Sequence, residues 1–124
     1  MMSEATVIIV DDDRSFVEAV ALYLEKHGYH ARMGFSGREG LDLLRNSEAD
    51  VAVIDVHMPD MSGLELAAAV RSRTSTPAVI LISGDDSVET AAQCQSAGVH
   101  CFMPKPLAPR ELLRVITQAV EQRN

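Results

Sequence analysis

Short apolar runs alternate along this chain with longer segments in which apolar residues recur every three or four positions. Three of the short runs are continuous and rich in β-branched residues, and they span residues 6–10, 51–54 and 78–82. Such runs are typical of strands buried on both faces of a parallel sheet. Two weaker runs, residues 30–33 and 99–103, predict further strands, and the polarity of the first indicates an edge of the sheet.

Helical segments lie between these strands. Helical spacing predicts helices over residues 14–26, 62–71 and 87–97 and a last helix with Pro109 in its first turn. Ser36 and Glu39 form a capping box that begins another helix. Alternating strands and helices with right-handed connections predict an α/β fold, a doubly wound (βα)5 three-layer sandwich of flavodoxin-like type. The predicted parallel sheet has five strands in the order 2-1-3-4-5.

The composition fits one globular domain. The chain has 124 residues, of which 47% are hydrophobic and 23% charged, so we expect a single domain over residues 1–124 with one hydrophobic core. The net charge of -7 disfavours direct binding of nucleic acid or of an anionic membrane. There is no apolar stretch of membrane-spanning length and no signal peptide at the start, so we expect a cytoplasmic protein.

Polar residues stand where the buried strands end. Asp11, Asp12 and Asp13 follow the first strand, Asp55 the third, Ser83 the fourth and Lys105 the fifth. Because the carboxyl ends of parallel strands form the binding crevice of such folds, we expect these side chains to lie close together. We expect Asp13 to cap the following helix.

Clustered carboxylates require a positive counterpart. Each pair about 5 Å apart repels by roughly 3 kcal/mol at an effective dielectric constant of 20. A hard divalent cation such as Mg²⁺, with Lys105 as a second positive group, offsets this repulsion. With its charge neutralised in this way, Asp55 becomes a candidate nucleophile toward a phosphoryl group, whose oxygens Mg²⁺, Lys105 and the Ser83 hydroxyl can bind.

Four segments together resemble the receiver domain of bacterial two-component response regulators. They are residues 6–13, which end in the acidic cluster, residues 54–66, residues 79–84 and residues 97–106. The second contains D-x-x-M-P-x-x-x-G and the last contains K-P. The resemblance covers essentially the whole chain. It implies a phosphorelay switch that is not a conventional enzyme, although it catalyses its own phosphorylation and dephosphorylation.

The resemblance also implies a role for each matching residue. Asp55 matches the phosphorylated aspartate, and Lys105 matches the lysine that contacts the phosphoryl group. The implied Mg²⁺ ligands, which could also hold Mn²⁺, are Asp12 directly, Asp11 mainly through water, Asp55 and the backbone carbonyl of His57. Ser83 matches the hydroxyl residue that turns toward the phosphoryl group, Phe102 matches the aromatic switch residue, and the peptide bond before Pro106 is expected to be cis.

The implied partners are a sensor histidine kinase or a histidine phosphotransfer protein as donor. The face made by the fourth helix, fifth strand and fifth helix is expected to change on phosphorylation and to bind a downstream protein, an output domain or a second copy of the chain. His57 and Asp85 are expected to lie at the mouth of the site and to modulate dephosphorylation. Phe102 lacks a tyrosine hydroxyl, so its switching must depend on packing.

Three alternatives remain open at this point. A phosphatase of the haloacid dehalogenase type also uses Asp and Mg²⁺, but its nucleophile follows the first strand. A flavin- or nucleotide-binding domain requires a phosphate loop rich in Gly, Ser or Thr, where this chain has three aspartates. A receiver that acts as an interaction module without phosphorylation usually lacks one of the acidic residues or the lysine. The chain is either a stand-alone regulator or part of a longer protein.

Overall fold

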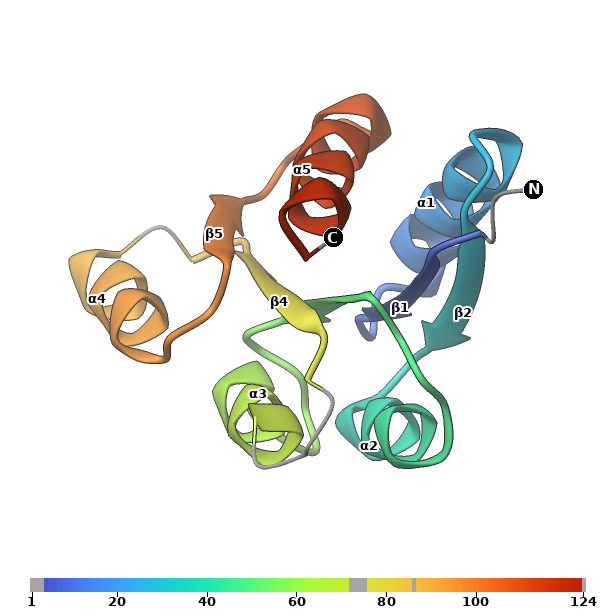
Figure 1. Ribbon diagram of the computed structural model, residues 1–124. Helices are drawn as coiled ribbons and strands as arrows, with labels where there is room; N and C mark the ends of the chain where they lie inside the picture. Colours follow the sequence, from blue (N-terminus) through green and yellow to red (C-terminus); the bar gives the residue numbers. More distant parts are fainter. Residues whose placement is uncertain (1–3, 72–75, 86, 124) are drawn as a thin grey trace.

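The computed structural model describes residues 4–71, 76–85 and 87–123. Strands and helices alternate through this chain (Figure 1). The strands are β1 (Thr6–Val10), β2 (His30–Gly34), β3 (Val51–Asp55), β4 (Ala78–Ser83) and β5 (Cys101–Pro104). The helices are α1 (Arg14–Lys26), α2 (Gly37–Asn46), α3 (Gly63–Arg71), α4 (Val88–Ser96) and α5 (Pro109–Arg123). Among the described residues, no helix has both the length and the apolar character needed to cross a bilayer.

All five strands pair in parallel in the order β2-β1-β3-β4-β5, as the sequence predicts. The polar strand β2 lies at an edge of the sheet, which confirms that prediction too. Helices α1 and α5 cover one face, and α2, α3 and α4 cover the other (Figure 1). The fold is therefore a three-layer sandwich in which strand order reverses between β1 and β3, where a crevice forms.

Each face of the sheet packs its own apolar cluster. On the α1 and α5 side, Val20, Leu24 and Ile116 pack on alternate residues of the central strands. On the opposite side, Leu66 and Val70 of α3 pack on the intervening residues. Because both faces are covered, the central strands are continuous apolar runs, and β3 is buried throughout.

The start of β5 differs from the sequence prediction. The strand begins at Cys101 and not at residue 99. Gly98 ends the preceding turn with a φ of 71°, and the chain comes fully alongside β4 only after His100, whose N–H donates to the Val79 carbonyl. Val99 packs against the apolar cluster under α4, so its hydrophobic character reflects core packing outside the strand.

The predicted helix caps are present with one change of partner. Asp13 accepts a hydrogen bond from the Phe16 N–H, as expected for an N-cap. Ser36 likewise accepts from the Glu39 N–H. The Glu39 carboxylate, however, accepts from the Phe35 N–H at 2.7 Å, one residue before the position that a standard capping box uses.

Candidate functional site

The candidate functional residues lie at the carboxyl ends of four neighbouring strands. Asp11 directly follows β1, Asp55 is the last residue of β3, Ser83 is the last of β4, and Lys105 follows β5. The strand register places Asp55 beside Ile82, one residue before Ser83. The structure therefore brings the predicted site residues to one edge of the sheet, at the point where strand order reverses.

Three carboxylates form a compact cluster at this edge. One oxygen from each of Asp11, Asp12 and Asp55 lies within 4.8 Å of the others. Asp11 and Asp55 are buried, whereas Asp12 is exposed. Asp11 also accepts a hydrogen bond from the Asp13 N–H at 2.9 Å, which fixes its carboxylate at the start of α1. The cluster concentrates negative charge in a place where water screens it poorly.

Lys105 supplies positive charge to this cluster. Its Nζ donates to Oδ2 of Asp11 at 2.6 Å and lies 3.5 Å from Oδ2 of Asp55. Burial by itself lowers the pKa of Lys105, but the hydrogen bond to Asp11 and the charge of Asp55 outweigh it and raise the pKa above its ordinary value. Lys105 is therefore charged at neutral pH and held between two carboxylates.

The Asp55 carboxyl group has a raised pKa. Burial is the main reason that its pKa rises from 3.8 to about 6, and the neighbouring Asp11 charge adds to the rise. A hydrogen bond from the His57 N–H and the charge of Lys105 act in the opposite direction. Ionised Asp55 is thus a carboxylate in an unfavourable environment, which a bound cation would relieve.

The donor set fits a hard divalent cation. The three side-chain ligand atoms are carboxylate oxygens, which suit Mg²⁺ or Mn²⁺ and do not suit a soft metal. The cluster combines three acidic side chains with one ammonium group, so its formal charge is negative. Asp12 is exposed and can approach a cation that keeps several of its waters. The residues present therefore match the expected metal.

The loop after Asp55 folds back tightly on β3. The Gly63 N–H donates to the Val56 carbonyl at 2.8 Å, and His57 forms an antiparallel bridge with Ser62. A Cβ built on Gly63 would lie 2.1 Å from the carbonyl oxygen of Asp55. This close return explains the glycine at the end of D-x-x-M-P-x-x-x-G and holds the residues after Asp55 in a compact turn.

Ser83 connects the ends of β4 and β5. Its side chain is fully buried, and its Oγ accepts a hydrogen bond from the Asp85 N–H at 2.9 Å. Its backbone carbonyl accepts from the Lys105 N–H at 2.7 Å. The hydroxyl therefore lies at the same strand edge as the carboxylates, with the backbone of Lys105 tied to the same residue.

His57 and Asp85 meet at the mouth of the site. His57 Nε2 lies 3.4 Å from Oδ2 of Asp85, and both side chains are about half exposed. Two hydrogen bonds from the start of α4 fix the Asp85 carboxylate: the Thr90 hydroxyl donates to it at 2.7 Å and the Ser87 N–H at 2.9 Å. The Thr90 and Ser87 hydrogen bonds lower the pKa of Asp85 to about 2.

Two further predictions concern the β5 side. The peptide bond between Lys105 and Pro106 is cis, as expected. The Phe102 ring is half-buried against the apolar cluster under α4. It lines a cavity of about 310 Å³ whose other walls include Ala91 and Cys94 of α4. The ring therefore borders an open pocket between α4 and β5.

Three residues near the site have roles that sequence reasoning did not assign. Thr90 holds Asp85, Phe16 lies against Lys105, and Asp60 accepts hydrogen bonds from the Gly37 and Arg38 N–H groups at 3.0 Å. The Ser87–Thr90 spacing is a capping signal that could have indicated Thr90. The other two contacts join segments distant in the sequence, and no local pattern announces them.

The fold and the carboxylate cluster together define the class: an open, doubly wound α/β protein with an acidic crevice at its strand ends. Residues 7–117 match the response regulator receiver domain family. The chain belongs to this family. Magnesium and phosphorylation are general in receiver domains of two-component systems, and their action is typically signalling without conventional enzyme activity. Histidine kinases and output domains are their general partners.

Similar proteins agree with this assignment. The response regulator MprA of Mycolicibacterium vanbaalenii is 36% identical over 107 residues, which cover 86% of this chain and 46% of that protein. The chain thus spans about half the length of the curated relatives it matches. A CheY-like receiver domain protein from Methanospirillum hungatei superposes with a TM-score of 0.91 at 29% identity, covering 97% of this chain and 96% of the other. The Francisella response regulator 1452 receiver domain superposes with a TM-score of 0.90 at 26% identity, covering 98% of this chain and 100% of the other.

Proposed function

We propose that this chain is a phosphoacceptor switch in which Asp55 takes a phosphoryl group from the phosphohistidine of a sensor histidine kinase or a histidine phosphotransfer protein. One observation carries the proposal: the Asp55 carboxylate ends the central strand in reach of two further carboxylates and the Lys105 ammonium group. We further propose that residues 1–124 form one receiver domain.

The proposed transfer has a simple balance. A carboxylate oxygen of Asp55 attacks phosphorus and forms a P–O bond. The bond from phosphorus to the donor's imidazole nitrogen breaks, and the electron pair stays on that nitrogen, which takes up a proton from solvent. Hydrolysis ends the signal. A water oxygen attacks phosphorus, the bond to the Asp55 oxygen breaks, and the carboxylate and inorganic phosphate are released. Both steps occur within this domain.

Positive charge and hydrogen-bond donors around the phosphoryl oxygens supply the catalysis. The proposed metal ligands are oxygen atoms from the side chains of Asp11, Asp12 and Asp55 and from the backbone carbonyl of His57. Mg²⁺, or Mn²⁺ in its place, would when bound supply positive charge that offsets these carboxylates and polarises a phosphoryl oxygen. The Lys105 ammonium group donates to a second oxygen and the Ser83 hydroxyl to a third.

Signalling follows from a population shift between two packings of the domain. In the proposed switch, the Ser83 hydroxyl turns toward the phosphoryl group and the Phe102 ring moves inward. Both residues adjoin the face made by α4, β5 and α5, so that face changes shape. It then binds a downstream protein, an output domain of a longer chain, or a second copy to form a homodimer.

Intact-protein mass spectrometry after incubation with acetyl phosphate tests this proposal. We expect one added phosphoryl group on the wild type in the presence of Mg²⁺, and none with EDTA or with Asp55→Asn. Asp42→Asn is the matched control, because Asp42 is an exposed acid on α2, and it should be phosphorylated like the wild type. Beryllofluoride with Mg²⁺ should also perturb the NMR signals of Ser83 and Phe102.

Two results would contradict the proposal. One is an adduct that persists in Asp55→Asn, because the acceptor would then be another group. The other is the absence of both an acetyl phosphate adduct and a beryllofluoride response, which would favour an interaction module that keeps the receiver fold without phosphorylation.

A further inference from the structure

The face of the Phe16 ring lies against the Lys105 ammonium group. Lys105 Nζ is 4.9 Å from the ring centroid, within the range in which a cation is attracted by the electrons of an aromatic ring. Phe16 is half-buried against the apolar cluster on the α1 and α5 side. The ring therefore has a fixed support on one side and the lysine on the other.

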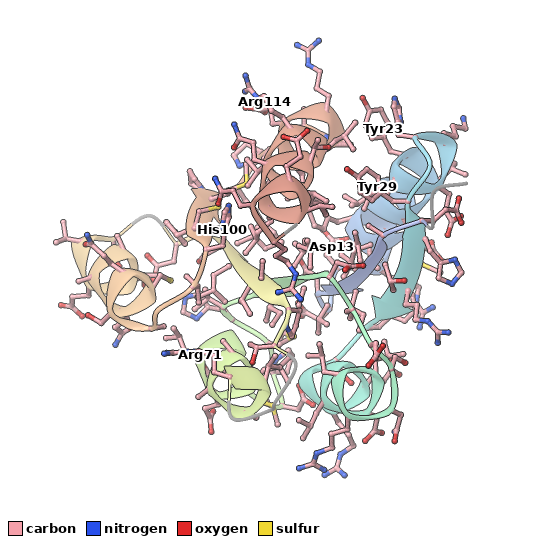
Figure 2. All side chains as sticks on the ribbon, viewed as in Figure 1. Asp13, Tyr23, Tyr29, Arg71, His100 and Arg114 are labelled. Atoms are coloured by element: carbon pink, nitrogen blue, oxygen red, sulfur yellow. The ribbon has the colours of Figure 1, made fainter. Side chains whose placement is uncertain are left out.

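Phe16 and Lys105 belong to a closed circuit of contacts that begins and ends at Asp11. Oδ1 of Asp11 accepts from the Asp13 N–H at 2.9 Å, and the Asp13 carboxylate accepts from the Phe16 N–H at 3.2 Å. The Phe16 ring faces Lys105, whose Nζ returns to Oδ2 of Asp11 at 2.6 Å. The first turn of α1 thus sets the ring in a defined position relative to the carboxylate that holds the lysine (Figure 2 labels Asp13 at this turn).

The lysine also borders open space on one side. A cavity of about 440 Å³ adjoins it, and its lining includes Phe16, Pro106, Leu107 and Asp13. The lysine side chain has four flexible carbons and a strongly hydrated charge. The ion pairs with Asp11 and Asp55 hold the ammonium group on the side of the carboxylates, and the Phe16 ring, which lines this cavity, lies against it from α1.

We propose that Phe16 is a positioning residue for Lys105, and that its ring face keeps the ammonium group at the carboxylate cluster, where it can act on a phosphoryl group. This inference deepens the proposed function and rests on it for the rate measurement below. The placement of Lys105 itself is independent of phosphorylation and has its own measurement.

The test compares Phe16→Leu, which removes the ring, with Phe16→Tyr, which keeps the ring face. The chain has only two lysines, Lys26 and Lys105, so protein labelled with ¹³C-lysine gives two resolvable side-chain signals. In the wild type, the Hε signal of Lys105 should be shifted upfield of exposed Lys26 by the aromatic ring. We expect this shift to disappear in Phe16→Leu and to persist in Phe16→Tyr.

The second measurement is the rate of phosphorylation by acetyl phosphate with Mg²⁺. Loss of the ring should lower the rate about three- to tenfold in Phe16→Leu, while Phe16→Tyr should stay within about twofold of the wild type. If Phe16→Leu fails to fold, Phe16→Met replaces it. An unchanged Lys105 signal in the variant without the ring, or an equal loss of rate in Phe16→Tyr, would overturn the inference. A wild type that shows neither an acetyl phosphate adduct nor a beryllofluoride response contradicts the proposed function instead, and the NMR comparison still decides the placement of Lys105.

Discussion

His57 and Asp85 meet beside the site, with Nε2 of the imidazole 3.4 Å from Oδ2 of the carboxylate. His57 comes from the loop after β3, and Asp85 from the loop after β4. The contact therefore bridges the two loops that flank Asp55. We predict that the pair slows hydrolysis of phosphorylated Asp55, because the contact lies beside the route by which water reaches the strand edge.

The first prediction concerns the lifetime of the phosphorylated form. We expect His57→Ala and Asp85→Ala each to shorten it about three- to tenfold, because either change opens the same mouth to water. The double variant should add little to the single ones, since the two residues act as a pair. Loss of the added phosphoryl mass over time measures the lifetime. Glu48→Gln, an exposed change on the chain before β3, is the control, and additive effects of the two variants would contradict the pairing.

A second prediction follows from the pKa of Asp55, which burial and Asp11 raise from 3.8 to about 6. A raised carboxyl pKa means that the folded state favours the protonated acid. The Asp55 carboxyl group therefore does not lower the stability of the fold below pH 3.8. It lowers the free energy of unfolding increasingly between pH 3.8 and about 6, and by its full amount above that. Without Mg²⁺, Asp55→Asn should therefore stabilise the fold by about 1 to 3 kcal/mol near pH 7.5.

Urea unfolding in EDTA at pH values on both sides of this window measures the effect. The stabilisation by Asp55→Asn should shrink to near zero at about pH 3.5. Mg²⁺ should raise the unfolding midpoint of the wild type more than that of the variant, because it binds the ionised cluster of the folded state. A gain in stability that is the same at every pH would show that charge is not its cause.

The positions of the site residues were largely predictable from the sequence, for a physical reason. Continuous apolar runs identify parallel strands, and the carboxyl ends of such strands meet at one edge. Asp11, Asp55, Ser83 and Lys105 each follow or end such a run, so strand order alone brings them together. The capping role of Asp13 was equally predictable, because it depends on residues within one helical turn.

Contacts that depend on side-chain direction between distant segments were not predictable. Phe16 and Lys105 meet because the first turn of α1 and the loop after β5 both lie at the carboxyl ends of the strands. Nothing in the local sequence around either residue encodes that contact. The start of β5 was misplaced because an apolar residue such as Val99 gives the same signal whether it pairs in a strand or packs in the core beside one.

A third prediction concerns Asp60, which joins the loop after Asp55 to the first turn of α2. Hydrogen bonds from the Gly37 and Arg38 N–H groups lower the pKa of Asp60. A lowered carboxyl pKa stabilises the fold above pH 3.8 and loses that effect as pH falls through the lowered value. Asp60→Asn should therefore lower the unfolding midpoint near neutral pH.

Thermal unfolding over a pH series measures this effect. The difference between Asp60→Asn and the wild type should narrow as the pH falls below 3.8. Asp42→Asn, on the exposed face of the same helix, should show no such narrowing. If the unfolding midpoints of Asp60→Asn and the wild type differed by the same amount at every pH, the loss of stability would not come from the charge of Asp60.

The last prediction compares two glycines that flank the site. A Cβ on Gly63 would lie 2.1 Å from the carbonyl oxygen of Asp55 and 2.9 Å from Cα of Val56. Both neighbours are backbone atoms of a buried strand end, so neither can move without displacing the Asp55 carboxylate. A Cβ on Gly84, by contrast, has no atom of the described residues within 4 Å, apart from the adjoining chain.

Gly63→Ala should therefore destabilise the fold by at least about 2 kcal/mol, and Gly84→Ala by less than about 0.5 kcal/mol. Urea unfolding of the two variants measures both values under the same conditions. Because the clash at Gly63 pushes on Asp55 itself, the folded fraction of Gly63→Ala should also accept a phosphoryl group more slowly than the wild type. Equal stability of Gly63→Ala and Gly84→Ala would contradict this prediction. It would show that the turn after Asp55 can accommodate a Cβ and that the close return of Gly63 to β3 does not fix the Asp55 carboxylate.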